Sequence, residues 1–301
     1  MSADYPMKTL KAISLSLGEL ASPVITQYQI GLIIHTLYRE KHYKGQALTL
    51  QKETATLRDV NHYITLLEED GVISSPKQLP DHVYTLLGRT SWSEEDVLCS
   101  IDPFCYLSHF SAMAHHGLTE RVPIRLFVSS PGEKDWRHYA EERMRKDLGE
   151  HIDEYLSNRM PRLVKIPVKS IGTKEVHRFN SLHLGAYRTV RDRPLRVSSI
   201  GRTFLDMLRN PDLCGGMRHV VEVYEEHAER YLRLITDEIN QHGHPIDKVR
   251  AGYILDERLG LGNSVINDWK RFAQRGGTRK LDPTNEYEPQ WSDHWLISLN
   301  L

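Results

Sequence analysis

The stretch TLRDVNHYITLLEEDGVISSPKQLPDHVYTLLG, residues 56–88, decides the fold of the N-terminal part, because it predicts one helix followed at once by two strands. The apolar residues of its first half recur on one face of a helix: Leu57, Val60, Ile64 and Leu67. Thr56 and Asp59 have the spacing of a capping box at the start of this helix. Gly71 is placed to end it in a left-handed conformation.

Two short strands are predicted next, at Val72–Ser75 and Val83–Leu87, on either side of a turn that contains proline and lysine. Upstream, residues 23–41 carry apolar residues at helical spacing, which predicts another helix. Helices that lead directly into a strand hairpin are the layout of a winged helix-turn-helix. We therefore expect a winged helix-turn-helix DNA-binding domain over residues 1–90, with a polar linker at Gly88–Glu95.

The rest of the chain, residues 96–301, predicts a larger domain of mixed helices and strands. Helices are expected at 97–117, 134–160 (with a break at Gly149), 198–210, 215–240 and 247–261. Strands are expected at 124–130, 163–171, 176–190 and 293–301. The predicted fold class is therefore α+β, an N-terminal winged helix-turn-helix followed by a larger mixed α/β C-terminal domain.

The composition is that of an ordinary soluble globular chain, with 40% hydrophobic and 26% charged residues. The formal net charge of -1 gives no global attraction to nucleic acid or to a membrane surface, so a DNA contact must come from a local patch. The three cysteines lack metal-ligand or redox spacing, and no charged leader precedes an apolar run. We expect reduced thiols, a cytoplasmic location and no membrane association, because the apolar runs are too short to span a bilayer.

A histidine-rich stretch, LSHFSAMAHHGLTERVP at residues 107–123, raises the question of a metal or catalytic site. His109 and His116 are seven positions apart, whereas two metal-binding histidines on a helix prefer a spacing of four. No Cys, Asp or Glu lies within the predicted helix to complete a coordination shell. The stretch instead predicts a capped helix, with Ser108 as the N-cap and Gly117 as the left-handed residue that ends it. We expect no catalytic residue, no metal and no cofactor.

The same stretch lies within YLSHFSAMAHHGLTERVPIRLFVSS, residues 106–130, which resembles the helix–glycine–strand signature of the AbiEi family. A second block, LRVSSIGRTFLDMLRNPDLCGGMRHVVEVY at residues 195–224, is similar to the family's Arg-Thr-x-x-Asp helix and the Pro and Gly-Gly that follow it. Arg202 and Asp206 carry this second signature and, four positions apart on a helix, are expected to pair with each other. The block departs from the family pattern at Gly201, where an acidic residue is expected.

AbiEi proteins are antitoxins and transcriptional regulators of bacterial type IV toxin–antitoxin and abortive phage infection systems. The resemblance covers about residues 105–225 and implies an N-terminal winged helix, which agrees with the prediction for residues 1–90. It further implies that the C-terminal domain counteracts a nucleotidyltransferase toxin encoded beside it. In a type IV system the antitoxin opposes its toxin without a requirement for a stable complex.

The predicted helix after Thr56 turns several polar side chains away from its apolar face, where they can reach base edges in a major groove. The expected DNA-binding residues of this helix are Thr56, Arg58, Asn61, His62 and Thr65. Lys52 before the helix and Lys77 in the hairpin turn are expected to contact phosphates. Residues 1–90 contain nine Lys plus Arg and nine Asp plus Glu, so the expected basic patch is local.

Two basic groups outside the first domain are candidates for an accessory surface that widens a DNA footprint or meets an acidic partner. They are Arg188, Arg191, Arg193 and Arg196 in one group, and Lys270 and Arg271 in the other. The alternative interpretation is that these cations only balance the acidic helices of the same domain.

The sequence therefore predicts a non-enzymatic protein that binds double-stranded DNA. The resemblance to the AbiEi family implies that it represses its own promoter, at inverted repeats, and acts as an antitoxin. Two alternatives stay open. One is a winged-helix regulator with a ligand-sensing C-terminal domain and no toxin partner. The other is a nucleic-acid-processing enzyme that uses the helix of His109 and His116.

Overall fold

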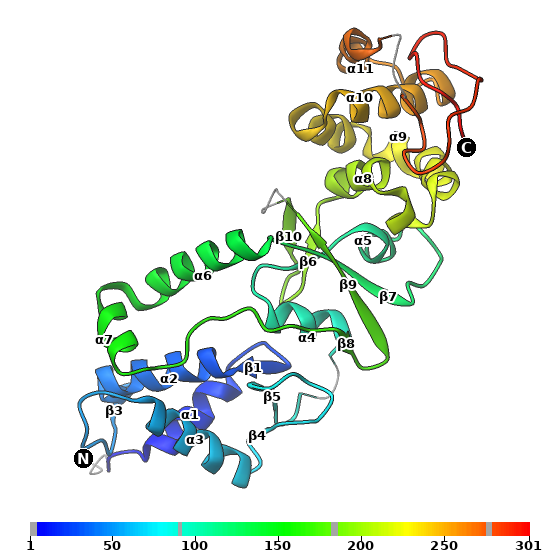
Figure 1. Ribbon diagram of the computed structural model, residues 1–301. Helices are drawn as coiled ribbons and strands as arrows, with labels where there is room; N and C mark the ends of the chain where they lie inside the picture. Colours follow the sequence, from blue (N-terminus) through cyan, green and yellow to red (C-terminus); the bar gives the residue numbers. More distant parts are fainter. Residues whose placement is uncertain (1–4, 90–91, 182–185, 275–278) are drawn as a thin grey trace.

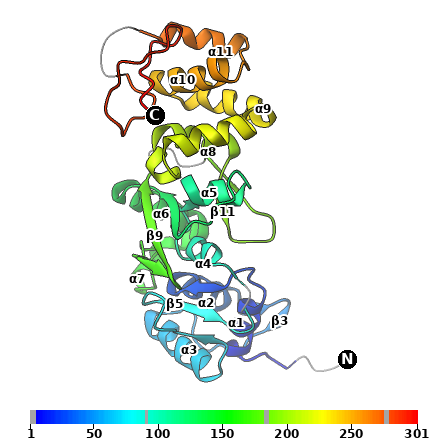
Figure 2. The ribbon, with the colours of Figure 1, turned by 90° about the vertical axis from the view of Figure 1, so that its right-hand side faces the viewer.

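The computed structural model describes residues 5–89, 92–181, 186–274 and 279–301. Its architecture is mixed α/β. Figures 1 and 2 show three parts along one long axis: helices and small sheets near the N-terminus, a larger sheet in the middle, and a helical part near the C-terminus. The two termini lie at opposite ends of the molecule.

The N-terminal part places helices around a small sheet. Its elements are α1 (Thr9–Gly18), β1 (Val24–Thr26), α2 (Gln27–Glu40), β2 (His42–Tyr43), β3 (Gln46–Ala47), α3 (Leu57–Glu69), β4 (Ile73–Ser74) and β5 (Val83–Leu86). The predicted hairpin strands are confirmed, since β4 and β5 pair antiparallel. β1 adds to the other edge of β5, which gives the strand order β1-β5-β4.

The helix α3 follows its sequence pattern closely. Val60, Ile64 and Leu67 are buried, and Gly71 has the left-handed φ of 67° expected after the helix end. The predicted helix at 23–41 is only partly correct, because it begins at Gln27. The β-branched residues before it, Val24–Thr26, pair with β5 as a strand instead. The helix α1 lies upstream of every predicted element.

A long segment of the middle part returns to cover the N-terminal helices, and we call residues 133–169 the strap. It contains α6 (Glu133–Leu148), a 3-10 turn η1 (Gly149–His151), α7 (Ile152–Ser157) and an irregular return to the middle sheet. Figure 1 shows the strap crossing over α2. Four of its side chains are buried in the same hydrophobic cluster as α1, α2 and α3: Met144, Leu148, Tyr155 and Met160. The N-terminal core is therefore not built from residues 1–90 alone.

The middle part is organised by a six-stranded mixed sheet with the order β10-β11-β6-β7-β9-β8. Its strands are β6 (Tyr106–Leu107), β7 (Arg125–Ser130), β8 (Ser170–Ile171), β9 (Lys174–Asn180), β10 (Tyr187–Thr189) and β11 (Arg196–Ser198). The pairs β11–β6 and β7–β9 are parallel, and the other neighbours are antiparallel. The helices α4 (Glu94–Ile101) and α5 (His109–His115) pack against this sheet.

The C-terminal part is helical and packs on α5. Its elements are α8 (Ile200–Arg209), a 3-10 turn η2 (Pro211–Cys214), α9 (Met217–His242), α10 (Pro245–Gly252), a π-helical turn η3 (Tyr253–Arg258), α11 (Ser264–Asp268) and a 3-10 turn η4 (Trp269–Phe272). One hydrophobic cluster joins α5, α8, α9 and α10 to the C-terminal tail. The predicted helices at 198–210 and 215–240 are confirmed within two residues at each end.

Three further predicted elements are wrong in part. The helix expected at 97–117 is interrupted, because Pro103 follows α4 and the chain then forms β6 before α5 begins. The strand expected at 163–171 pairs only at Ser170–Ile171. The strand expected at 293–301 forms only isolated bridges at Ser298, to Lys280 and Trp291. Of the strand expected at 176–190, residues 182–185 lie outside the described part.

None of the helices in the described part of the chain is both long and apolar enough to cross a membrane.

Candidate nucleic-acid interface

The outward face of α3 carries four of the predicted DNA-binding side chains. Arg58, Asn61, His62 and Thr65 are all exposed. Gln27 at the start of α2 donates its side-chain amide to Asn61 Oδ1 over 3.1 Å, which fixes the orientation of Asn61. In the described residues the Nδ2 group of Asn61 has no hydrogen-bond partner, and the residue is exposed. The face is therefore accessible, and one of its amides is held in place by the neighbouring helix.

The N-terminus of α3 is closed by an acidic residue that also holds a lysine. Asp59 accepts hydrogen bonds from the backbone N–H of Thr56 at 3.0 Å and from its hydroxyl at 2.7 Å. Lys52 lies 2.6 Å from the same carboxylate. Although burial raises the pKa of Asp59, Lys52 and Thr56 lower it by more, and the net shift is downward. Thr56 and Lys52 thus hold the helix end, and Lys52 is not a free cation.

The turn between β4 and β5 lies next to the start of α2. Lys77 in the turn is exposed. The backbone N–H of Gln27 donates to the carbonyl of His82 over 2.9 Å, so the base of the hairpin is joined to the start of α2. Because the side chain of Gln27 also holds Asn61, the hairpin, α2 and α3 meet at one residue.

The strap contributes residues to this region that the sequence did not indicate. The backbone N–H of Leu57, the first residue of α3, donates to the carbonyl of Asn158 over 3.4 Å. Arg162 lines a hollow of about 210 Å³ together with Gln27 and His82. These contacts join positions about a hundred residues apart, and no periodicity or motif in the sequence carries such information.

The first accessory basic group does not form one surface. Arg188 and Arg191 are exposed. Arg193, however, donates to Asp96 at 2.6 Å and 3.0 Å, and Arg196 donates to three backbone carbonyls at 2.6–2.8 Å. The accepting carbonyls belong to Cys99, Asp102 and Cys105. The prediction of an accessory surface is therefore wrong for Arg193 and Arg196, which hold α4 against the sheet.

The second accessory group lies in the C-terminal part, beyond α10 in Figure 1. Lys270 pairs with Asp256 over 3.0 Å and lies over the ring of Trp295, so it serves the local packing. Arg271 is exposed, with its guanidinium 4.8 Å from the centroid of Phe272. The charge of Lys270 is thus paired locally, and a role of this group in an accessory surface stays a prediction.

The histidines in and after helix α5 contact different parts of the structure. His109 is 1% exposed, has a left-handed φ of 49°, and has its Nδ1 2.8 Å from the hydroxyl of Ser108. The Nε2 of His116 lies 2.7 Å from the carbonyl of Ser198. Burial lowers the pKa of both histidines, which favours neutral rings. Within the described residues, no three His, Cys, Asp or Glu side chains are grouped so that they could hold a metal ion.

The predicted caps of α5 are Ser108 at its N-terminus and Gly117 after its C-terminus. Ser108 occupies the N-cap position, but its hydroxyl bonds to His109 and does not cap the helix, so this detail of the prediction is wrong. Gly117 has the expected left-handed φ of 65°. Its N–H donates to Ala114 and the next N–H, of Leu118, donates to Met113 over 2.9 Å, which is a Schellman closure.

The signature pair of the second block forms the expected contact. Arg202 Nε lies 2.7 Å from Asp206 Oδ1, with both side chains buried. Gly201 is tightly enclosed, because a Cβ at this position would lie 2.3 Å from the carbonyl oxygen of Leu234 on α9. The acidic residue of the family pattern has no space here. Glu238, one turn further along α9, approaches the same place.

A polar centre in the middle part was not predicted. The carboxylate of Asp102, 1% exposed, accepts from the indole N–H of Trp136 at 3.0 Å and from the hydroxyl of Ser130 at 3.2 Å, and it pairs with Arg178. These bonds fix the start of the strap to the sheet. They leave the carboxylate fully occupied, so we assign it a structural role.

The comparisons with known proteins give little further information. The chain matches no model of a known protein family, and no curated protein matches it. Among solved structures, the crystal structure of the Rv2827c protein from Mycobacterium tuberculosis is similar, with 14% sequence identity and a TM-score of 0.46. The match covers 95% of this chain and 90% of that chain. A similarity at this level decides neither fold nor function.

Proposed function

We propose that the protein is a DNA-binding repressor and antitoxin whose N-terminal part, residues 5–89, is a winged helix-turn-helix. Apart from the short β2–β3 pair inserted between α2 and α3, the order is α1-β1-α2-α3-β4-β5, and three of these strands form one antiparallel sheet, which supports this assignment. In this assignment α3 is the recognition helix, and the turn between β4 and β5 is the wing.

The observation that carries the proposal is the outward face of α3. A helix with Arg58, Asn61, His62 and Thr65 exposed has the side chains that read guanine and adenine edges in a major groove. Gln27 fixes Asn61 before DNA arrives, which reduces the side-chain entropy lost on binding. Lys77 in the wing is available for a phosphate.

The antitoxin part of the proposal rests on the resemblance to the AbiEi family. In this proposal the region after residue 95 counteracts a nucleotidyltransferase toxin, whose gene lies next to the gene of this protein. The adjacent reading frame tests this assignment. A nucleotidyltransferase gene there, whose toxicity is relieved by co-expression of this protein, supports it. Undiminished toxicity in such a co-expression refutes it.

DNA binding is tested with the full chain, a duplex from the region upstream of its gene and a random duplex of equal length. We expect Arg58→Ala with Asn61→Ala to abolish the preference for the upstream duplex, because each bidentate base contact contributes about 1–3 kcal/mol of discrimination. Lys77→Ala should weaken both duplexes alike. The matched control is Thr36→Ala with Arg39→Ala on the exposed side of α2, which should bind as the wild type does. Equal and weak binding of both duplexes by the wild type contradicts the repressor proposal.

A regulator with a ligand-sensing C-terminal domain is the second candidate, and one observation favours it. A hollow of about 450 Å³, within the range of small-molecule sites, lies between α5, the β10–β11 pair and α9. His115, Arg188 and Glu238 are among its lining residues. Glu238 Oε1 is buried without a hydrogen-bond partner among the described residues, and burial raises the pKa of this carboxyl. Loss of operator binding on addition of cell metabolite extract, prevented by Glu238→Gln, would favour this candidate.

A further inference from the structure

The N-terminal part has too few free cations for a DNA-binding unit of its own. Residues 1–90 contain nine Lys and Arg residues and nine Asp and Glu residues. Three of its lysines are paired with carboxylates: Lys41 with Glu53, Lys44 with Glu19 and Lys52 with Asp59. Phosphate neutralisation supplies most non-specific affinity for DNA. Further cations must therefore border the α3 face if the proposed function holds.

The strap is seated firmly enough on α2 to provide them. A Cβ on Gly31 of α2 would lie 2.8 Å from the hydroxyl of Tyr155 and 3.1 Å from the ring of Pro161, so only glycine admits this contact without a shift. The hydroxyl of Tyr155 donates to the carbonyl of Pro161 over 2.7 Å. Tyr155 and Met160 are buried in the N-terminal core. The turn at residues 158–162 is thus held from both sides.

Two exposed arginines of this turn lie near the N-termini of α3 and α2. Arg159, with a left-handed φ of 55°, directly follows Asn158, whose carbonyl accepts from the first N–H of α3. Arg162 lines the hollow shared with Gln27, which in turn holds Asn61. Arg159 is therefore next to the N-terminus of α3, and Arg162 is next to the N-terminus of α2.

The charge of these arginines is not neutralised by neighbours. Residues 155–169 include four basic residues and no acidic one. One of the four, Lys165, pairs with Glu133 at 3.4 Å. Neither Arg159 nor Arg162 forms an ion pair within the described ranges, and both are exposed. Free guanidinium groups at helix N-termini attract anions, and they match phosphate oxygens in a bidentate geometry.

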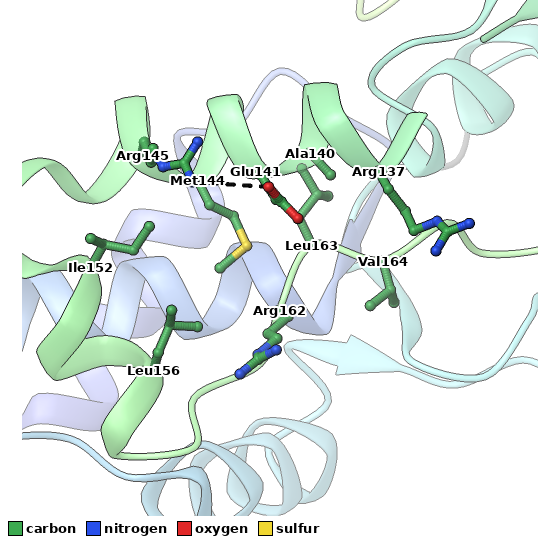
Figure 3. A pocket seen from close by; sticks show the side chains of 10 residues that line it. All are labelled: Arg137, Ala140, Glu141, Met144, Arg145, Ile152, Leu156, Arg162, Leu163 and Val164. Carbon is green, nitrogen blue, oxygen red and sulfur yellow. Dashed lines mark ion pairs between the residues drawn. The ribbon is translucent and has the colours of Figure 1, made fainter. Parts of the chain in front are cut away.

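Arg162 also lines a second hollow. Figure 3 shows Arg137 and Arg145 on α6 and Arg162 on the returning segment around an apolar floor that includes Met144 and Leu156. This hollow measures about 400 Å³. An acidic peptide with an apolar anchor would be the alternative occupant of such a rim. Arg159, however, is not among the residues that line it, and its place at α3 favours DNA.

We propose that Arg159 and Arg162 of the strap bind the DNA backbone on either side of the base-reading face of α3. The inference rests on the proposed DNA-binding function and extends the interface beyond residues 1–90. The partner is double-stranded DNA, read here through its phosphates and without sequence preference. The strap thereby supplies the positive charge that residues 1–90 lack.

The test measures binding of the full chain to the upstream duplex and to the random duplex between about 50 and 200 mM salt. For Arg159→Gln with Arg162→Gln we expect a loss of roughly tenfold on both duplexes, with the preference between them retained. The slope of log affinity against log salt should flatten by about 2, since each lost phosphate contact removes about 0.9. Arg159→Lys with Arg162→Lys should restore most of the affinity, because a phosphate contact needs the charge.

The matched control removes two exposed arginines from α9, Arg230→Gln with Arg233→Gln, and should leave binding unchanged. Thermal unfolding checks that the glutamine pair folds normally, as expected for exposed side chains. Wild-type affinity and salt slope in the glutamine pair overturn the inference alone. A wild type that binds neither duplex refutes the proposed function as well. Normal DNA binding combined with lost binding to poly-L-glutamate would assign the arginines to an acidic protein partner and overturn the DNA inference.

Discussion

The buried pair Arg202–Asp206 allows a quantitative prediction, because the chain contains an exposed pair of the same residue types and spacing. The side chains of Arg202 and Asp206 are 5% and 3% exposed, and their contact distance is 2.7 Å. The comparison pair, Arg233–Asp237 on α9, is 92% and 69% exposed at 3.7 Å. Asp206→Ala leaves a buried guanidinium without its counter-charge, which typically costs about 3–5 kcal/mol. Asp237→Ala removes a solvent-screened contact worth about 0.3–0.5 kcal/mol.

The assay is urea denaturation followed by tryptophan fluorescence, with the free energy of unfolding extrapolated to water. The expected loss for Asp206→Ala corresponds to roughly two to four powers of ten in the unfolding equilibrium constant. Arg202→Met combined with Asp206→Leu should recover most of this loss, because replacing both members of a buried ion pair with apolar side chains is often nearly neutral.

The hydrogen bonding of Arg202 and Asp206 explains why apolar side chains should be able to replace them. Arg202 Nη1 and Asp206 Oδ2 are both buried without a hydrogen-bond partner among the described residues, so the pair already bears an unsatisfied desolvation cost. If Asp206→Ala loses no more stability than Asp237→Ala, the charge of Arg202 is compensated by another group and the reasoning is wrong. If the double replacement is as unstable as the single one, packing and not charge dominates this site.

Further predictions concern a helix contact, a buried histidine and the strap. Gly201→Ala should cost about 1–3 kcal/mol through overpacking against α9, whereas Gly18→Ala, which meets open space, should not destabilise, as measured by urea denaturation. Burial lowers the pKa of His109 below 6.5, so the unfolded chain binds a proton that the folded chain excludes. Stability should therefore fall as the pH drops below about 6.5, and His109→Asn should reduce that pH dependence. Gly31→Ala should displace Tyr155 and loosen the turn of the strap, detected as faster tryptic cleavage at residues 159 and 162.

Three outcomes would contradict these expectations. Equal stability of the Gly201 and Gly18 variants would mean that α8 and α9 can separate at no cost. A pH profile unchanged by His109→Asn would mean that its ring is protonated in the folded state or that other buried histidines, such as His35, carry the whole effect. Unchanged cleavage in the Gly31 variant, with Gly18→Ala as its control, would mean that the strap is held by its apolar side chains alone.

Local patterns gave the parts of the fold that local energetics control. The stripe of α3, the capping role of Asp59, the glycine after the helix end and the Schellman closure at Gly117 all depend on residues within a few positions of one another. Such interactions are encoded in short windows. The four outward side chains of α3 were predictable for the same reason.

Non-local contacts account for the failures. Tyr106–Leu107 lies inside a helical pattern, yet it forms β6 because β7 and β11 offer backbone partners on both sides. Arg193 and Arg196 resemble a free basic surface in the sequence, but their acceptors lie about ninety to a hundred positions away. No short window of the sequence shows that Asn158 contacts the first residue of α3. The sequence therefore did not indicate Arg159 and Arg162 as candidate phosphate contacts.

The seating of the strap on α2 and α3 also sets an order of events during synthesis. A nascent chain that has left the ribosome up to residue 90 contains all of α3, but Met144, Leu148, Tyr155 and Met160 are not yet available to pack on it. The partner for the first N–H of α3 arrives only with residue 158. The ribosome must therefore deliver more than half of the chain before the N-terminal helices can close their core, and separate expression of residues 1–90 would reproduce an unfinished intermediate.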